Sequence, residues 1–92
     1  MSALSQSQIT AHMAQMPEWR VDSGELVRTR QFKDFRAAMA FVNKLADLAE
    51  QAGHHPDIDI RYNKVRLALV THDAGGLTAK DFDLAGKSDK LA

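Results

Sequence analysis

The sequence predicts an α+β fold: helix, two strands, helix, two strands, helix (α-β-β-α-β-β-α), with the helices packed on one face of a four-stranded antiparallel sheet. Three observations predict this fold class. Residues 34–53 repeat their apolar side chains at helical spacing, residues 57–62 and 65–70 alternate apolar with polar side chains, and helix-capping patterns occur on both sides of them. The chain of 92 residues has no linker or internal repeat, so we expect one domain spanning residues 1–92.

The first helix and the first hairpin precede the long helix. Ser5 or Ser7 can cap a short helix over residues 6–15. Residues 19–21 and 26–32 lie on either side of a turn-forming Asp-Ser-Gly sequence, which predicts an antiparallel pair of strands.

Two further helices begin at recognisable N-cap residues. Asp34 is followed by apolar side chains at helical spacing as far as Gly53, the residue type that most often ends a helix. Thr78 has Asp81 three residues later, which is the capping-box pattern. The run Asp-Ala-Gly-Gly at residues 73–76 predicts a flexible turn before this last helix.

The second hairpin is predicted to turn at residues 63–64, between strands 57–62 and 65–70. This register gives three apolar pairs on one face, namely Tyr62 with Val65, Ile60 with Leu67 and Ile58 with Leu69. Continued toward the strand ends, it places His55 directly opposite His72, on the more polar face of the sheet.

The three histidines of the C-terminal half are the main candidates for chemistry. His54 and His55 directly precede Pro56, and His72 directly precedes Asp73. Because histidine titrates near neutral pH, two imidazoles on opposite sides of a substrate can supply one acid and one base. The hairpin brings at least two of them together close to a carboxylate, so the residues are equally consistent with a site for acid/base catalysis and with solvated or hydrogen-bonded structural histidines.

A metal site is the alternative chemistry for the same cluster. The three histidines offer nitrogen ligands, and Asp73 or Asp81 offers a fourth ligand. Adjacent histidines in a strand point to opposite faces, however, and no His-x-x-x-His pair occurs on a helix. We therefore rank acid/base use above metal binding.

Two acidic residues have roles that the residues alone leave open. Glu50 lies four residues before His54 and can orient an imidazole by accepting its ring N–H, or it can be an ordinary exposed helix residue. Asp81 can act near the histidines or simply cap the last helix.

Composition excludes several classes of function. The 12 Lys and Arg residues equal the 12 Asp and Glu residues in number, so no net charge favours nucleic acid as a partner. The absence of cysteine excludes disulfides, thiol catalysis and thiolate metal sites. No stretch approaches the about 18 apolar residues of a membrane span, so we expect no membrane partner and a cytoplasmic location.

Four short motifs together resemble the pterin-4a-carbinolamine dehydratase family. They are Glu-Gln-Ala-Gly-His-His-Pro at 50–56, Tyr-Asn-Lys-Val at 62–65, Thr-His-Asp at 71–73 and Gly-Leu-Thr-Ala-Lys-Asp at 76–81. The resemblance implies the fold predicted above, with homodimers that extend the sheet and that commonly pair into homotetramers. It also implies removal of water from 4a-hydroxytetrahydrobiopterin, a product of aromatic amino acid hydroxylases, without metal or cofactor, in tetrahydrobiopterin recycling.

The resemblance also implies roles for the three histidines. His54 and His72 would be the acid/base pair, although the motif does not assign acid or base to either, and His55 would chiefly bind and orient the pterin. This assignment requires Pro56 to turn His54 toward the site instead of letting it follow the strand.

Four other positions match the same motifs. Thr71 and Asp73 would flank His72 and bind substrate, whereas Glu50 and Asp81 would have supporting roles. The alternative functions are a non-catalytic interaction module, of the kind that supports dimerisation of a transcription factor, and a pterin-binding protein of molybdopterin-related metabolism.

Overall fold

Three helices begin where capping residues predict them. The computed structural model describes residues 2–91, so the two end residues of the expected domain, 1 and 92, lie outside the described part of the chain. The helices are α1 (Gln6–Met13) after Ser5, α2 (Phe35–Ala52) after Asp34 and α3 (Ala79–Asp89) after Thr78. The side chain of each N-cap residue accepts a hydrogen bond from a backbone N–H of the first turn. Only the end of α1 differs from expectation, because this helix stops at Met13 instead of residue 15.

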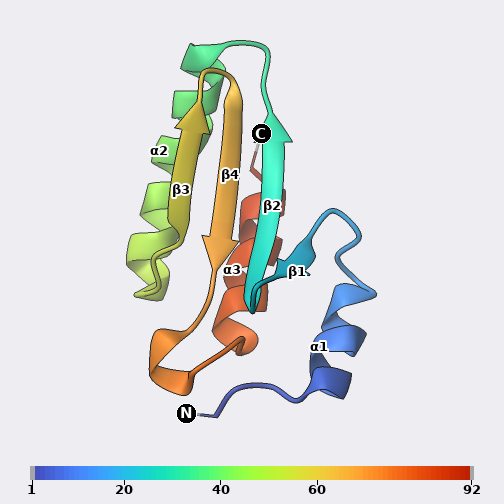
Figure 1. Cartoon of the computed structure of the whole chain (residues 1–92). Coiled ribbons are helices and arrows are strands. Elements are labelled where there is room, and N and C mark those ends of the chain that lie inside the picture. The colour runs from blue at the N-terminus through green and yellow to red at the C-terminus, as the bar shows by residue number, and fades with distance from the viewer. Residues whose placement is uncertain (1, 92) are drawn as a thin grey trace.

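A four-stranded antiparallel sheet lies beside the helices. Its strands are β1 (Arg20–Asp22), β2 (Glu25–Gln31), β3 (Asp57–Arg61) and β4 (Lys64–Leu69), and their order across the sheet is β1-β2-β4-β3. The helices α2 and α3 run along one face of this sheet, and α1 packs near its β1 side (Figure 1). This arrangement confirms the predicted fold class.

The register of the second hairpin differs from the prediction by two residues. The turn consists of Tyr62 and Asn63, so Ile58 pairs with Leu67 and Ile60 pairs with Val65. Tyr62 has a φ of 54°, the left-handed conformation that a tight hairpin turn requires. Because side chains alternate with a period of two, the shift keeps the predicted apolar face and changes only the partners.

This shift removes the predicted pairing of His55 with His72. The strand β3 starts only after Pro56, and β4 ends at Leu69, so neither histidine belongs to the strand ladder. The histidines lie beyond the strand ends instead of on the polar face of the sheet.

The core lies between the sheet and the two long helices. Its largest fully buried apolar side chains are Leu26, Phe41, Leu45, Val65, Leu67, Leu69 and Leu84. Ile9 and Met13 of α1 pack against this core, and the ring of His12 stacks on Phe82 of α3 at 4.5 Å between centroids. Within residues 2–91, no helix combines the length and apolar character needed to cross a membrane.

Candidate active site

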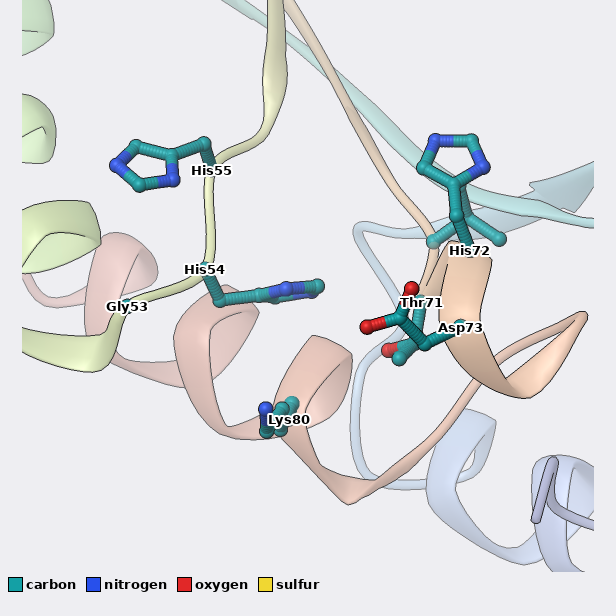
Figure 2. A pocket seen from close by; sticks show the side chains of 8 residues that line it. Gly53, His54, His55, Thr71, His72, Asp73 and Lys80 are labelled. Carbon is teal, nitrogen blue, oxygen red and sulfur yellow. The ribbon is translucent and has the colours of Figure 1, made fainter. Parts of the chain in front are cut away.

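A cavity of about 290 Å³ opens where the α2–β3 connection, the segment after β4 and the start of α3 meet. Its lining residues are Gly53, His54, His55, Val70, Thr71, His72, Asp73 and Lys80. Figure 2 shows the ring of His54 projecting toward Thr71 and Asp73, whereas the ring of His55 is turned away from them. All three histidines singled out in the sequence therefore border one cavity, as do Thr71 and Asp73.

The C-terminal end of α2 positions His54. Gly53 adopts a left-handed conformation with φ of 62°, and the N–H of His54 donates to the carbonyl of Ala49 at 3.1 Å. The N–H of Gly53 donates to the carbonyl of Glu50 at 3.3 Å, which completes a Schellman motif. His54 thus leaves the helix in a fixed direction before β3 begins. As predicted, His54 does not follow the pleat of β3, which starts at Asp57. The contacts that set its direction belong to the cap of α2, and the expected turn at Pro56 stays a prediction.

A buried carboxylate holds the ring of His54. Its Nε2 atom lies 2.5 Å from Oδ1 of Asp81, in the first turn of α3. Asp81 is fully buried, and its Oδ2 accepts hydrogen bonds at 2.9 Å from the Thr71 hydroxyl and from the backbone N–H of Thr78. The Thr71 and Thr78 hydroxyls are 2.8 Å apart. Because each buried polar atom of this cluster has a partner, the cluster is a rigid support for His54.

The second histidine–carboxylate pair is exposed. His55 Nε2 lies 2.5 Å from Oε2 of Glu50, and their side chains are 63% and 75% exposed. Glu50 therefore contacts an imidazole, as its position at the end of α2 suggested, and this imidazole is the one of His55. In water, such a pair orients the ring only weakly.

A closed turn after β4 carries His72 and Asp73. These residues start a 3-10 turn, η1 (His72–Ala74), which ends at Gly75 with φ of 74°. Thr71 and Gly76 exchange backbone hydrogen bonds of 3.1 and 3.3 Å across the turn. The segment expected to be a flexible turn is thus pinned at both ends, and His72 is held at the exposed rim of the cavity.

Sequence reasoning missed three of the lining residues, namely Gly53, Val70 and Lys80. Lys80 is exposed, and it borders the cavity from the first turn of α3. Its position between Thr78 and Asp81 was an available signal, because every side chain in the first turn of that helix lies close to the same end of the sheet.

The arrangement suits proton transfer. Two imidazoles from separate segments border one cavity, and one of them is held by a buried carboxylate while the other stays exposed. Imidazoles in such different surroundings can act as base and acid in one reaction. Among residues 2–91, no group of three or more His, Cys, Asp or Glu side chains is arranged to hold a metal ion.

The fold and the site together define a small α+β protein with a histidine-lined cavity at one end of its sheet. Residues 2–91 match the family model described as pterin 4 alpha carbinolamine dehydratase. The chain belongs to this family. A relative from Acidobacterium capsulatum, named "Putative pterin-4-alpha-carbinolamine dehydratase", is 58% identical over 91 residues. The alignment covers 99% of this chain and 99% of the relative.

Solved structures show the same fold. A transcriptional coactivator/pterin dehydratase from Brucella melitensis superposes with a TM-score of 0.92 at 30% identity, with 96% of each chain covered. A pterin dehydratase-like protein identified as a RuBisCO assembly factor in the alpha-carboxysome has a TM-score of 0.70 at 27% identity, covering 82% of this chain and 89% of the other. The fold therefore occurs in proteins whose names describe both catalysis and assembly.

Proposed function

We propose that this protein is a hydro-lyase that removes water from 4a-hydroxytetrahydrobiopterin and so serves tetrahydrobiopterin recycling. The observation that carries the proposal is the convergence of His54 and His72 on one cavity from two separate segments. Membership of the dehydratase family supports the substrate class.

The reaction needs one proton to be removed and one to be supplied. A base takes the proton from N5 of the pterin, the C4a–N5 double bond forms, and the C4a–O bond breaks. An acid protonates the departing hydroxyl, which leaves as water, and the product is the quinonoid dihydropterin. His54 and His72 are the proposed acid/base pair, and such transfers contribute about 10²- to 10⁴-fold to a rate.

The remaining lining residues are proposed to bind and support. His55 binds and orients the pterin from the rim, and Asp73 contributes a carboxylate to the same cavity. Thr71 lines the cavity, although its hydroxyl is directed to Asp81 and Thr78. Glu50 supports His55 through their direct contact, and Asp81 supports His54 in the same way.

We also propose that the protein acts in the cytoplasm as a homodimer or homotetramer and receives its substrate from an aromatic amino acid hydroxylase. Two features support self-association. The strand β3 lies at an edge of the sheet with Ile58 partly exposed, and Phe35 of α2 is 49% exposed. An edge strand can pair with a second copy.

A direct assay tests the proposal. A hydroxylase reaction generates the 4a-hydroxytetrahydropterin, and its disappearance is followed by absorbance with and without this protein. The protein is expected to accelerate the loss at least tenfold over the spontaneous reaction, on the scale of proton-transfer catalysis. An unchanged rate at micromolar protein would refute the dehydratase assignment.

A second candidate is an interaction module without catalysis. It is favoured by the name of the solved relative that is a RuBisCO assembly factor. The two candidates differ in two measurable ways. A module should retain its partner binding when both His54 and His72 are replaced, and the wild-type protein should not accelerate dehydration.

A further inference from the structure

The hydrogen bonds around Asp81 run in one direction. The backbone N–H of Thr78 can only donate, and it donates to Oδ2 of Asp81 at 2.9 Å. The hydroxyl of Thr71 has one proton and gives it to the same oxygen. In the 2.8 Å contact between the two hydroxyls, Thr78 must therefore be the donor and Thr71 the acceptor. The carboxylate of Asp81 is the end point of these bonds.

This direction fixes the proton on His54. A carboxylate accepts hydrogen bonds and donates none, so the 2.5 Å contact at Oδ1 requires Nε2 of His54 to carry a hydrogen. In the neutral ring, Nδ1 is then unprotonated. None of residues 2–91 forms a hydrogen bond with Nδ1, and none of their polar side-chain atoms is buried without a partner. Nδ1 is therefore accessible, and the open space next to His54 is the cavity.

We propose that Thr71, Thr78 and Asp81 are positioning residues that hold His54 in the Nε2–H tautomer and so make its Nδ1 the catalytic base. This inference rests on the proposed dehydratase function and deepens it. Nδ1 of His54 removes the proton from N5 of the pterin. His72 then protonates the departing hydroxyl. His54 gains one proton and His72 loses one, so the proton transfers balance.

Replacement of Asp81 by asparagine reverses the tautomer for a definite reason. The Thr78 N–H still needs an acceptor, so the amide oxygen of the new side chain occupies the Oδ2 position. Its NH₂ group then faces Nε2 of His54, which must become an acceptor. The hydrogen of the neutral ring moves to Nδ1, where it blocks the proposed base.

The test is a long-range ¹H–¹⁵N spectrum of the ¹⁵N-histidine-labelled protein at a pH where its imidazoles are neutral. The His54 signals are assigned by their loss in His54→Ala. The wild type is expected to show the Nε2–H tautomer and Asp81→Asn the Nδ1–H tautomer. Asp34→Asn is the matched control, because Asp34 caps α2 far from the cavity and asparagine caps equally well. An Nδ1–H tautomer in the wild type, or an unchanged tautomer in Asp81→Asn, would overturn the inference.

A second pair of variants addresses the case in which Asp81→Asn does not fold. Thr71→Val keeps the shape of the side chain and removes the hydroxyl, whereas Thr71→Ser keeps the hydroxyl. Thr71→Val is expected to lower the population of the Nε2–H tautomer and to lower kcat by about tenfold with little change in KM, and Thr71→Ser should restore both. Equal behaviour of the two variants would contradict the positioning role.

The spectrum and the assay also separate the two proposals. The expected tautomer in a wild-type protein that does not accelerate dehydration would uphold the positioning of His54 and refute the dehydratase. Normal dehydration by a protein with the opposite tautomer would uphold the dehydratase and refute the assignment of Nδ1 as the base.

Discussion

Two histidine–carboxylate pairs with the same contact distance lie beside the cavity, and one is buried whereas the other is exposed. The pair of His54 and Asp81 is buried, with side-chain exposures of 11% and 0%, whereas the pair of His55 and Glu50 is 63% and 75% exposed. Both distances are 2.5 Å. The distance alone therefore says little about what a pair contributes.

Burial and additional partners make the difference. Asp81 has two further hydrogen-bond donors and no contact with water, so its orientation and that of His54 are fixed together. Glu50 and His55 remain surrounded by water, which competes for each of their hydrogen bonds. The buried pair is suited to hold a proton-transfer group, and the exposed pair is suited to adjust to a ligand.

The largest expected effect is on the rate, at His54. His54→Ala removes the ring supported by Asp81 and should lower the dehydration rate at least tenfold and up to about 10⁴-fold, as should His72→Ala, because each loses one proton transfer. Steady-state dehydration kinetics measure this loss. His12→Ala is the control, because His12 stacks on Phe82 outside the cavity, and it should remain within about twofold of the wild type. Near-normal rates in both active-site variants would contradict the assignment.

The next effect is on stability. Asp81→Ala leaves the donors of Thr71 and Thr78 without their buried acceptor and should lower the free energy of unfolding by about 1–3 kcal/mol. Glu50→Ala should lower it by less than about 1 kcal/mol, because the exposed pair contributes little. Urea unfolding followed by circular dichroism compares the two variants. Equal losses would show that burial does not distinguish the pairs.

A smaller effect is expected at His55. His55→Ala should raise KM by about tenfold or less, the equivalent of 1.4 kcal/mol of binding, while kcat changes by less than about twofold. Initial rates over a range of pterin concentrations separate the two constants. A loss confined to kcat would place His55 among the proton-transfer groups and would remove the contrast with His54.

No effect is expected from metal removal. Neither pair is part of a group of three potential ligands within residues 2–91, so dialysis against a chelator should leave the dehydration rate unchanged. The same assay before and after dialysis measures it. Loss of activity that zinc restores would favour a metal at the histidines.

The capping residues made most of the fold predictable. Ser5, Asp34 and Thr78 each start a helix through contacts within a few residues, and Gly53 ends α2 in the same local way. The register of the second hairpin was harder to predict from the sequence. The side-chain amide of Asn63 donates a hydrogen bond to the backbone carbonyl of Phe32 at 2.8 Å. The backbone N–H of Phe32 donates to the backbone carbonyl of Asn63, also at 2.8 Å. These contacts with a segment 31 residues away accompany the turn at Tyr62 and Asn63.

The two histidine–carboxylate pairs also differ in how far the sequence could predict them. Glu50 and His55 are five residues apart at a helix end, so their proximity could be inferred from the chain itself. His54 and Asp81 are 27 residues apart, and nothing in their local sequence relates them.

The sequence by itself therefore determined the helices, the strands, the apolar face of the sheet and the histidines available for chemistry, because these depend on the spacing of neighbouring residues. Only the tertiary structure decided which histidine meets the buried carboxylate. That contact arises when α2 and α3 pack on the same sheet and bring the end of one beside the beginning of the other.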